Sequence, residues 1–198
     1  PEGRAWSFAS AIHKYITSEK KSEKFRLNKL LIKRFRDGEM KPKIDENIRK
    51  ANCFFIHDSS ISPSEWFTQL LFANQAMKLA SANEIVDVLP YMAFSRQDRK
   101  DESRVAISAK VVADGIGQNA QHVLTIDAHF EQIQGFYDIP LDNLYSSVVL
   151  LDYLEKNHPE ILGEVVIMSP DVGGAKRAKA VADKLGVEDI VIGYKHRP

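Results

Sequence analysis

The fold is decided by residues 52–92, which have the sequence NCFFIHDSSISPSEWFTQLLFANQAMKLASANEIVDVLPYM. Two short apolar runs, residues 52–58 and 84–92, predict strands. Between them, residues 62–65 (SPSE) predict a helix start, with Ser at the cap, Pro in the first turn and Glu three residues after the cap. Apolar residues then recur at helical spacing. A strand–helix–strand unit of this kind predicts an α/β protein with a largely parallel sheet.

Strands and helices alternate in the same way along the rest of the chain. Short apolar runs predict further strands at residues 29–35, 122–127, 164–169 and 189–194. Amphipathic patterns predict helices at residues 7–17, 103–115, 146–157 and 175–185. The pair Asp37-Gly38 predicts a hairpin turn. A length of 198 residues allows one large domain or two small ones.

The composition excludes several classes of protein. Lys plus Arg and Asp plus Glu each total 27, the formal net charge is +0, and hydrophobic residues make up 44%. A disordered chain would have fewer apolar residues and a larger net charge. A disulfide scaffold needs more than the single Cys53, which we expect to be an inert core residue in a reducing, cytoplasmic protein. Neither a membrane nor a nucleic acid is an expected partner, because there is no long apolar run and no net positive charge.

The first candidate site follows the strand at residues 84–92. Residues 94–101 have the sequence FSRQDRKD, with three cations and two carboxylates close together. Arg96 and Arg99 could clamp phosphate oxygens with two hydrogen bonds each, and Asp101 could hold a base edge or an arginine. The alternative is a solvated charged loop, which the position directly after a strand makes less attractive.

The second candidate site follows the strand at residues 122–127. Asp127 and His129 lie at the end of that strand, and carboxylates with an imidazole suit a divalent cation that carries a nucleotide phosphate. Mg²⁺ typically takes only one or two protein ligands and keeps its waters. The alternative for His129 is a structural histidine. Asp138 and Asp142 flank Pro140, and the alternative for them is a role as turn residues.

The third candidate site is residues 169–177, SPDVGGAKR, at a junction between a strand and a helix. Gly173 and Gly174 allow the backbone to approach a ligand, and a helix N-terminus favours an anion. Asp171 could bind a metal or a sugar hydroxyl. The alternative is an ordinary tight turn, and the spacing of a Walker phosphate loop is absent.

A further motif carries no site. Residues 115–120, GIGQNA, match the dinucleotide fingerprint GxGxxA, but that fingerprint must follow a strand and open a helix. Here it follows an expected helix and precedes an expected strand. We therefore interpret it as a helix C-terminus and expect no nicotinamide or flavin site.

Four ordered motifs together resemble one family. They are FRDGE (35–39), SRQDRKD (95–101), DAHFEQIQGFYDIPLDNLY (127–145) and SPDVGGAKRA (169–178). They resemble ribose-phosphate pyrophosphokinase, also called phosphoribosyl pyrophosphate synthetase, over nearly the whole chain. The resemblance implies two similar phosphoribosyltransferase-type α/β domains, assembled into dimers or hexamers. It also implies transfer of the diphosphoryl group of ATP to the C1 hydroxyl of ribose 5-phosphate, with Mg²⁺, giving phosphoribosyl diphosphate and AMP.

The resemblance also implies roles for individual residues. It assigns ATP binding to Arg96, Gln97 and Asp101, and contact with the adenine in a neighbouring subunit to Phe35, Asp37 and Glu39. It assigns metal binding to His129 and Asp171, with Asp127, Asp138 and Asp142 as further candidates. It assigns the catalytic basic pair on a mobile loop to Lys195 and Arg197.

On this resemblance, residues 1–145 form an N-terminal α/β domain, and residues 146–198 form the first part of a second domain that ends in the catalytic loop. No segment matches the family's motif for the ribose 5-phosphate, so we expect a C-terminal part to be missing and the fragment alone to be inactive. Two alternatives stay open. One is a non-catalytic regulatory or structural subunit associated with a synthetase, and the other is a phosphoribosyltransferase, which the motif at residues 95–101 disfavours.

Overall fold

A computed structural model describes residues 4–19, 24–161 and 165–194 of the chain. It divides into two compact units, Pro1–Leu144 and Tyr145–Pro198. Across the described parts of both units, no helix is long and apolar enough to cross a membrane.

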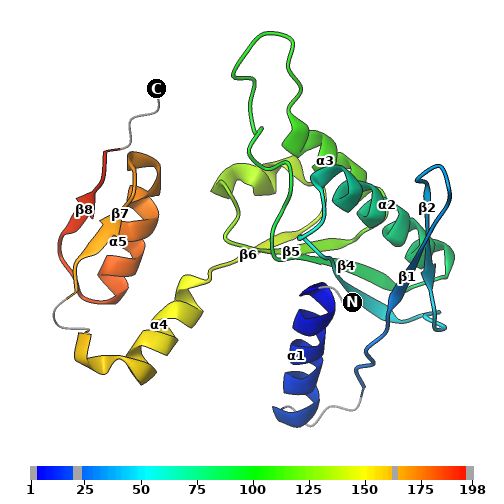
Figure 1. The fold of residues 1–198 in the computed structure, drawn as a ribbon, viewed down its shortest axis with the longest axis horizontal. Coiled ribbons are helices and arrows are strands. Elements are labelled where there is room, and N and C mark those ends of the chain that lie inside the picture. Colours follow the sequence, from blue (N-terminus) through cyan, green and yellow to red (C-terminus); the bar gives the residue numbers. More distant parts are fainter. Residues whose placement is uncertain (1–3, 20–23, 162–164, 195–198) are drawn as a thin grey trace. The chain divides into compact units, whose positions relative to one another are not determined.

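The first unit is built on a four-stranded parallel sheet with the order β3-β4-β5-β6 (Figure 1). The strands are Asn52–Ile56, Glu84–Leu89, His122–Ile126 and Leu141–Leu144. The α/β class with a parallel sheet is therefore confirmed. The first three strands end earlier than their apolar runs suggested, so His57, Met92 and Asp127 lie in the loops that leave the sheet.

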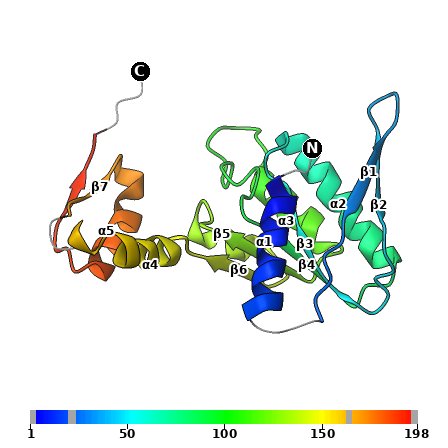
Figure 2. The same ribbon diagram turned by 60° about the horizontal axis from the view of Figure 1, so that its bottom comes forward.

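Helices cover both faces of this sheet. Figure 2 shows α2 (Pro63–Leu79) and α3 (Ser108–Gly117) along one face, and α1 (Arg4–Glu19) against the other. The expected helix start is confirmed, because the Ser62 side chain accepts a hydrogen bond from the Glu65 N–H at 3.4 Å. The buried side of α2 packs into the core through apolar side chains at helical spacing, namely Trp66, Leu70, Ala73 and Met77. Each large side chain of this kind stabilises the fold by roughly 1.5–3 kcal/mol.

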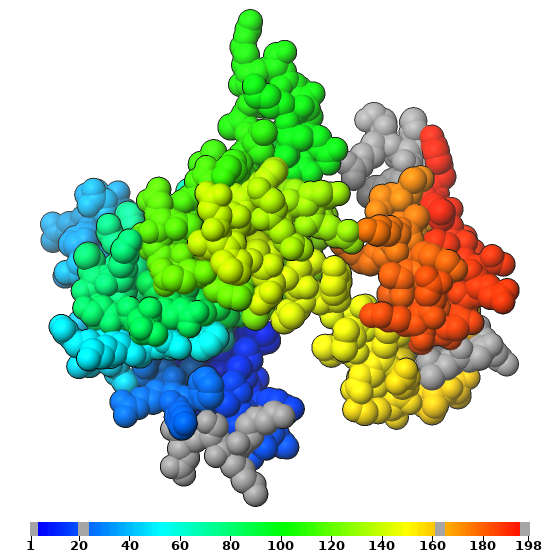
Figure 3. Space-filling view, turned by 180° about the vertical axis from the view of Figure 1, so that it is seen from behind, coloured from blue at the N-terminus to red at the C-terminus, as the bar shows by residue number. Residues whose placement is uncertain are grey.

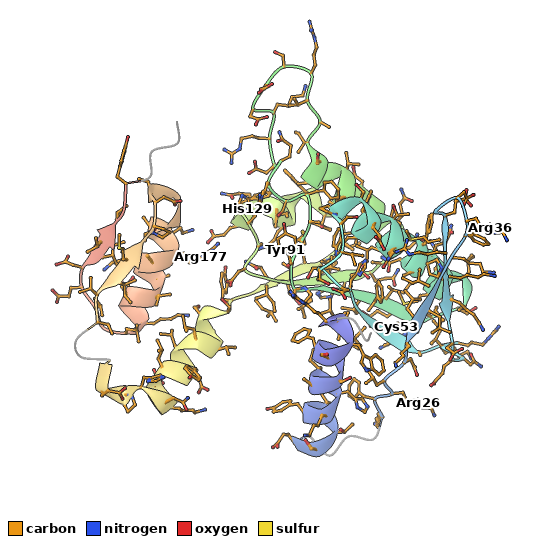
Figure 4. All side chains as sticks on the ribbon, viewed as in Figure 1. Arg26, Arg36, Cys53, Tyr91, His129 and Arg177 are labelled. Carbon is orange, nitrogen blue, oxygen red and sulfur yellow. The ribbon has the colours of Figure 1, made fainter. Side chains whose placement is uncertain are left out.

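Cys53 lies on β3 among the partly buried residues that pack against this core. Burial raises the pKa of its thiol, which keeps the sulfur in the protonated and less reactive form. The expectation of an inert core cysteine agrees with this position, which is labelled in Figure 4.

A two-stranded antiparallel hairpin precedes the sheet. Its strands are β1 (Leu30–Arg34) and β2 (Met40–Ile44). The expected Asp-Gly turn is confirmed: Gly38 has φ +95°, a conformation that glycine adopts without strain, and the Phe35 N–H donates to the Glu39 carbonyl at 2.8 Å. The second strand was not expected, because it contains Pro42, which is tolerated only in strands at an edge.

The predicted helix at residues 103–115 is wrong at both ends. The helix α3 begins at Ser108 and continues to Gly117. Arg104 has φ 65°, in the left-handed region that interrupts a right-handed helix. The first turn of the helix is tied back to the preceding loop, because the Ala109 N–H donates to the Gln97 carbonyl at 3.1 Å.

The motif at residues 115–120 ends α3, as expected, and its two glycines differ in their surroundings. A Cβ added to Gly115 would meet Phe67 Cζ at 2.9 Å, whereas a Cβ added to Gly117 would meet nothing within 4 Å. Gly115 therefore allows α3 to approach α2 closely.

We expect the substitution Gly115→Ala to destabilise the first unit by about 1–3 kcal/mol, because the Phe67 ring would have to move within a packed core. The matched control is Gly117→Ala on the same helix. This change should be neutral or stabilising by up to about 1 kcal/mol. Unfolding in guanidinium, followed by far-UV circular dichroism, measures both, and equal effects at the two positions would contradict the close approach.

The second unit is smaller. It contains α4 (Ser147–Asn157), the short turns η2 (Pro159–Ile161) and η3 (Val172–Gly174), α5 (Ala175–Lys184), and the parallel pair β7 (Ile167–Ser169) and β8 (Ile190–Ile192). Both strands are shorter than predicted, and residue 164 lies outside the described residues. The stop of α5 is as expected, because Gly186 follows the helix with φ +71°.

Candidate functional site

The loops after β4 and β5 leave the same end of the sheet side by side, because the two strands pair in parallel with Leu89 opposite Thr125. Figure 4 labels Tyr91 and His129 in these two loops. In Figure 3, the green segment near residue 100 projects from the body of the unit. A hydrogen bond of 3.3 Å from the Tyr137 hydroxyl to Met92 Sδ connects the bases of the two loops in the core.

The base of the first loop is fixed by a buried serine. Ser95 is 6% exposed, and its hydroxyl donates to the Met92 carbonyl at 2.9 Å. Beyond it, Gln97 Nε2 donates to Asp101 Oδ1 at 2.8 Å and to the Arg99 carbonyl at 2.7 Å. The hydrogen bond from Gln97 lowers the pKa of Asp101, so this carboxylate stays charged. Two of the three expected ATP-binding residues in the loop are thus in direct contact.

The two arginines of this loop have different surroundings. Arg99 donates from Nε and Nη2 to the two oxygens of Asp98, at 2.8 and 2.9 Å. Arg96 is exposed, and it has no hydrogen-bond or ion-pair partner in the part of the chain that the structure describes. Its guanidinium therefore remains available for an anion, whereas that of Arg99 is already neutralised.

The loop after β5 carries Asp127 and His129. Asp127 has φ 48°, which turns the chain sharply as it leaves the sheet, and His129 is exposed. The pKa of Asp98 is lowered first by the hydrogen bonds from Arg99 and, more weakly, by the electrostatic interaction with His129. The loop of Arg96 and the loop of His129 leave the carboxyl ends of adjacent parallel strands.

The other two metal-binding candidates of unit 1, Asp138 and Asp142, have different neighbours. Asp142 lies on β6, so its interpretation as a turn residue is wrong, and its Oδ2 is 2.8 Å from His122 Nε2 near the amino end of β5. The pKa of Lys110 on α3 is raised first by the hydrogen bond that Lys110 donates to Asp114 and, more weakly, by the charge of the exposed Asp138. Asp142 is thus engaged by His122 on the neighbouring strand, and the charge of Asp138 acts on Lys110.

The tip of the β1–β2 hairpin carries Phe35, Asp37 and Glu39. All three are exposed, and Asp37 Oδ1 accepts the Glu39 N–H at 3.0 Å within the turn. Figure 4 shows the neighbouring Arg36 at this tip, well apart from His129. Within one chain, the tip does not contribute to the group around Arg96.

In the second unit, Asp171 stands at the end of β7 and caps the turn that leads into α5. Its Oδ1 accepts the Gly174 N–H at 3.1 Å, and a Cβ on Gly174 would lie 2.6 Å from Ser169 Oγ. The tight turn that we considered as an alternative is therefore present, with Asp171 holding it. Lys195 and Arg197 lie outside the described residues.

The candidate metal ligands of the first unit could hold a cation only together with other ligands, such as waters and the phosphates of a substrate. Among residues 4–19, 24–161 and 165–194, no group of three or more His, Cys, Asp or Glu side chains is arranged to hold a metal ion. Asp127 and His129 offer one carboxylate and one imidazole at an exposed edge. Such a set fits Mg²⁺ that keeps its waters and is held partly by substrate phosphates.

Sequence reasoning missed two residues that shape this site. Asp98 neutralises Arg99, and Asn143 on β6 accepts a hydrogen bond from the backbone beside His129. The charge alternation at residues 98–99 was a signal for the first of these. No local pattern indicated the second, because Asn143 is distant in sequence from its partner.

These features define a class of protein: a parallel α/β fold in which charged side chains gather at the carboxyl ends of adjacent strands, the usual position of ligand sites in such sheets. A family model described as the N-terminal domain of ribose phosphate pyrophosphokinase matches residues 5–119. The chain belongs to the ribose-phosphate pyrophosphokinase family.

Similar proteins extend this match beyond the first unit. The chain is 41% identical over 191 residues to ribose-phosphate pyrophosphokinase of Campylobacter jejuni, covering 96% of this chain and 58% of that protein. It is 47% identical over 165 residues to that of Chlorobaculum tepidum, covering 83% and 50%. A crystal structure of phosphoribosylpyrophosphate synthetase from Mycobacterium smegmatis matches with a TM-score of 0.78 and 28% identity, covering 96% of this chain and 61% of that one. The chain spans about half to three fifths of the length of these proteins.

Proposed function

We propose that the complete gene product carrying this chain transfers the diphosphoryl group of ATP to the C1 hydroxyl of ribose 5-phosphate. The hydroxyl oxygen forms a bond to the β-phosphorus, the bond from that phosphorus to the oxygen bridging the α-phosphate breaks, and AMP leaves. The hydroxyl proton is released. The products are phosphoribosyl diphosphate and AMP.

One observation carries this proposal: Arg96 is exposed, has no hydrogen-bond or ion-pair partner among the described residues, and lies on the loop beside that of Asp127 and His129, in a chain of this family. Arg96 would bind the phosphates directly, and Asp127 and His129 would hold the Mg²⁺ that accompanies them. Gln97 and Asp101, which already contact each other, would fix the shape of the nucleotide-binding loop. Because such reactions build charge on phosphate oxygens, this chain would contribute mainly positioning and electrostatic stabilisation.

The remaining assignments complete the proposal. Asp171 is a second metal ligand, and Lys195 and Arg197 are the catalytic cations. Asp138 and Asp142 are weaker candidates for metal binding, because Asp142 already contacts His122 and the charge of Asp138 already acts on Lys110. The hairpin tip at residues 35–39 would reach the nucleotide of a neighbouring subunit in a dimer or hexamer, which agrees with its exposure and its separation from His129. A cytoplasmic location and the inactivity of the 198 residues alone stay predictions.

The proposed function predicts that the complete gene product forms AMP and phosphoribosyl diphosphate only when Mg²⁺, ATP and ribose 5-phosphate are all present. Chromatographic separation of the nucleotides measures this directly. Omission of Mg²⁺ should remove the activity, because the metal neutralises the phosphate charge. No AMP under any of these conditions would reject the proposal in favour of a non-catalytic subunit.

A further inference from the structure

The backbone beside His129 is held by two successive acceptors on β6. The Asp127 N–H donates to the Leu144 carbonyl at 2.8 Å, and the Ala128 N–H donates to Asn143 Oδ1 at 2.9 Å. The first bond continues the parallel ladder, in which Ile126 lies opposite Leu144. The second bond is not part of the ladder, because Ala128 lies beyond the end of β5 and its acceptor is a side-chain oxygen.

The hydrogen bond from the Ala128 N–H to Asn143 Oδ1 satisfies a buried backbone donor. Ala128 is 9% exposed, so water has little access to its N–H, and a buried donor without a partner is costly. Asp127, the residue before it, has φ 48° and departs sharply from strand geometry. The ladder cannot follow such a turn, and Asn143, which is half-buried on the neighbouring strand, supplies the missing acceptor.

We propose that Asn143 is a positioning residue of the candidate site: its amide oxygen fixes the backbone between Asp127 and His129, and so fixes the direction of both side chains. This role rests on the proposed function, in which these two side chains hold the Mg²⁺ of a Mg-nucleotide. Asn143 touches neither the metal nor the nucleotide and acts through the Ala128 N–H. Removal of a group that orients metal ligands typically weakens metal affinity by about 10- to 100-fold.

Two substitutions separate the acceptor from the bulk of the side chain. Asn143→Leu keeps the branched shape and the number of side-chain heavy atoms and removes the acceptor, whereas Asn143→Asp keeps an oxygen in the same place. In the complete protein, we expect Asn143→Leu to weaken Mg-ATP binding by about 10-fold or more and to speed hydrogen exchange of the Ala128 amide. Asn143→Asp should keep the slow exchange and recover most of the affinity. Calorimetric titration and amide exchange by NMR give the two readouts.

A double-mutant cycle with His129→Ala distinguishes positioning from a general structural role. If Asn143 acts through this loop, Asn143→Leu should change Mg-ATP affinity by less than about twofold once His129 is gone. An equal loss in both backgrounds, or wild-type affinity in Asn143→Leu alone, would overturn the proposal. If the wild-type protein does not bind Mg-ATP, the proposed function fails. Exchange of the Ala128 amide then decides alone whether Asn143 supports this backbone, and unchanged exchange in Asn143→Leu would refute that too.

Discussion

The free energy of unfolding of the first unit is expected to fall by about 4 kcal/mol as the pH rises from 4 to 8, through Asp87 alone. Asp87 lies on β4, is 0% exposed, and burial raises its pKa from the ordinary 3.8 to about 7. Folding therefore takes up a proton between these two pH values. Stability from this group is present at low pH and is lost as the pH rises toward 7.

The contacts of Asp87 explain why the protonated form is preferred. Asn74 Nδ2 donates to Asp87 Oδ2 at 2.7 Å, and Asn74 Oδ1 and Asp87 Oδ1 are both buried with no hydrogen-bond partner among the residues that the structure describes. When Asp87 Oδ1 carries a proton, it can donate to Asn74 Oδ1. A carboxylic acid and a carboxamide can then form two hydrogen bonds with each other. The charged form would leave both oxygens unsatisfied in the core.

The variant Asp87→Asn tests this directly, because an amide keeps the shape but does not titrate. The difference in unfolding free energy between wild type and Asp87→Asn should change by about 4 kcal/mol between pH 4 and 8, in favour of the variant at high pH. Tryptophan fluorescence follows this unit, since Trp6 and Trp66 both lie in it. A difference for Asp87→Asn that stays constant between pH 4 and 8 would contradict a neutral Asp87.

The second large effect concerns Arg96. We expect Arg96→Ala to weaken Mg-ATP binding by about 100-fold, because a guanidinium that makes two charge-assisted hydrogen bonds to phosphate contributes on the order of 3 kcal/mol or more. The measurement is the rise in melting temperature of the complete protein with Mg-ATP, which should be lost at nucleotide concentrations that stabilise the wild type.

Arg99→Ala is the matched control for Arg96→Ala. It removes the same charge three residues further along the same loop, but Arg99 is already paired with Asp98. We therefore expect the Mg-ATP shift to survive in Arg99→Ala. If both variants lose it equally, the general charge of the loop and not the unpaired guanidinium of Arg96 is responsible for binding.

The sequence was a good guide to the elements that bury continuous apolar runs. The strands β3, β4 and β5 of the parallel sheet, the capped start of α2 and the Asp-Gly turn could all be predicted, because each has a local physical signature. The strand β6 could not, because LDNL is short and contains Asp142 and Asn143, which disfavour strands and are held by pairing with β5. The start of α3 was missed because the left-handed Arg104 has no sequence signature.

The candidate site was predictable only in part, for a related reason. Their positions directly after predicted strands identified Arg96 and His129 as candidate site residues. The contacts of other carboxylates, however, are made with residues that are distant in sequence. Asp142 on β6 contacts His122 on the adjacent strand β5, and Asp87 on β4 contacts Asn74 on the helix α2. Such pairings depend on tertiary packing and cannot be predicted from the spacing of residues along the sequence.

The central claim is that the whole diphosphoryl group moves, and ATP labelled with ³²P at the β-phosphorus tests it most directly. The complete gene product is incubated with this nucleotide, Mg²⁺ and ribose 5-phosphate, and the labelled products are separated. We predict that the label leaves the nucleotide and appears on the sugar, with unlabelled AMP as the other product. Label retained in ADP would show transfer of the terminal phosphoryl group alone and would contradict the account.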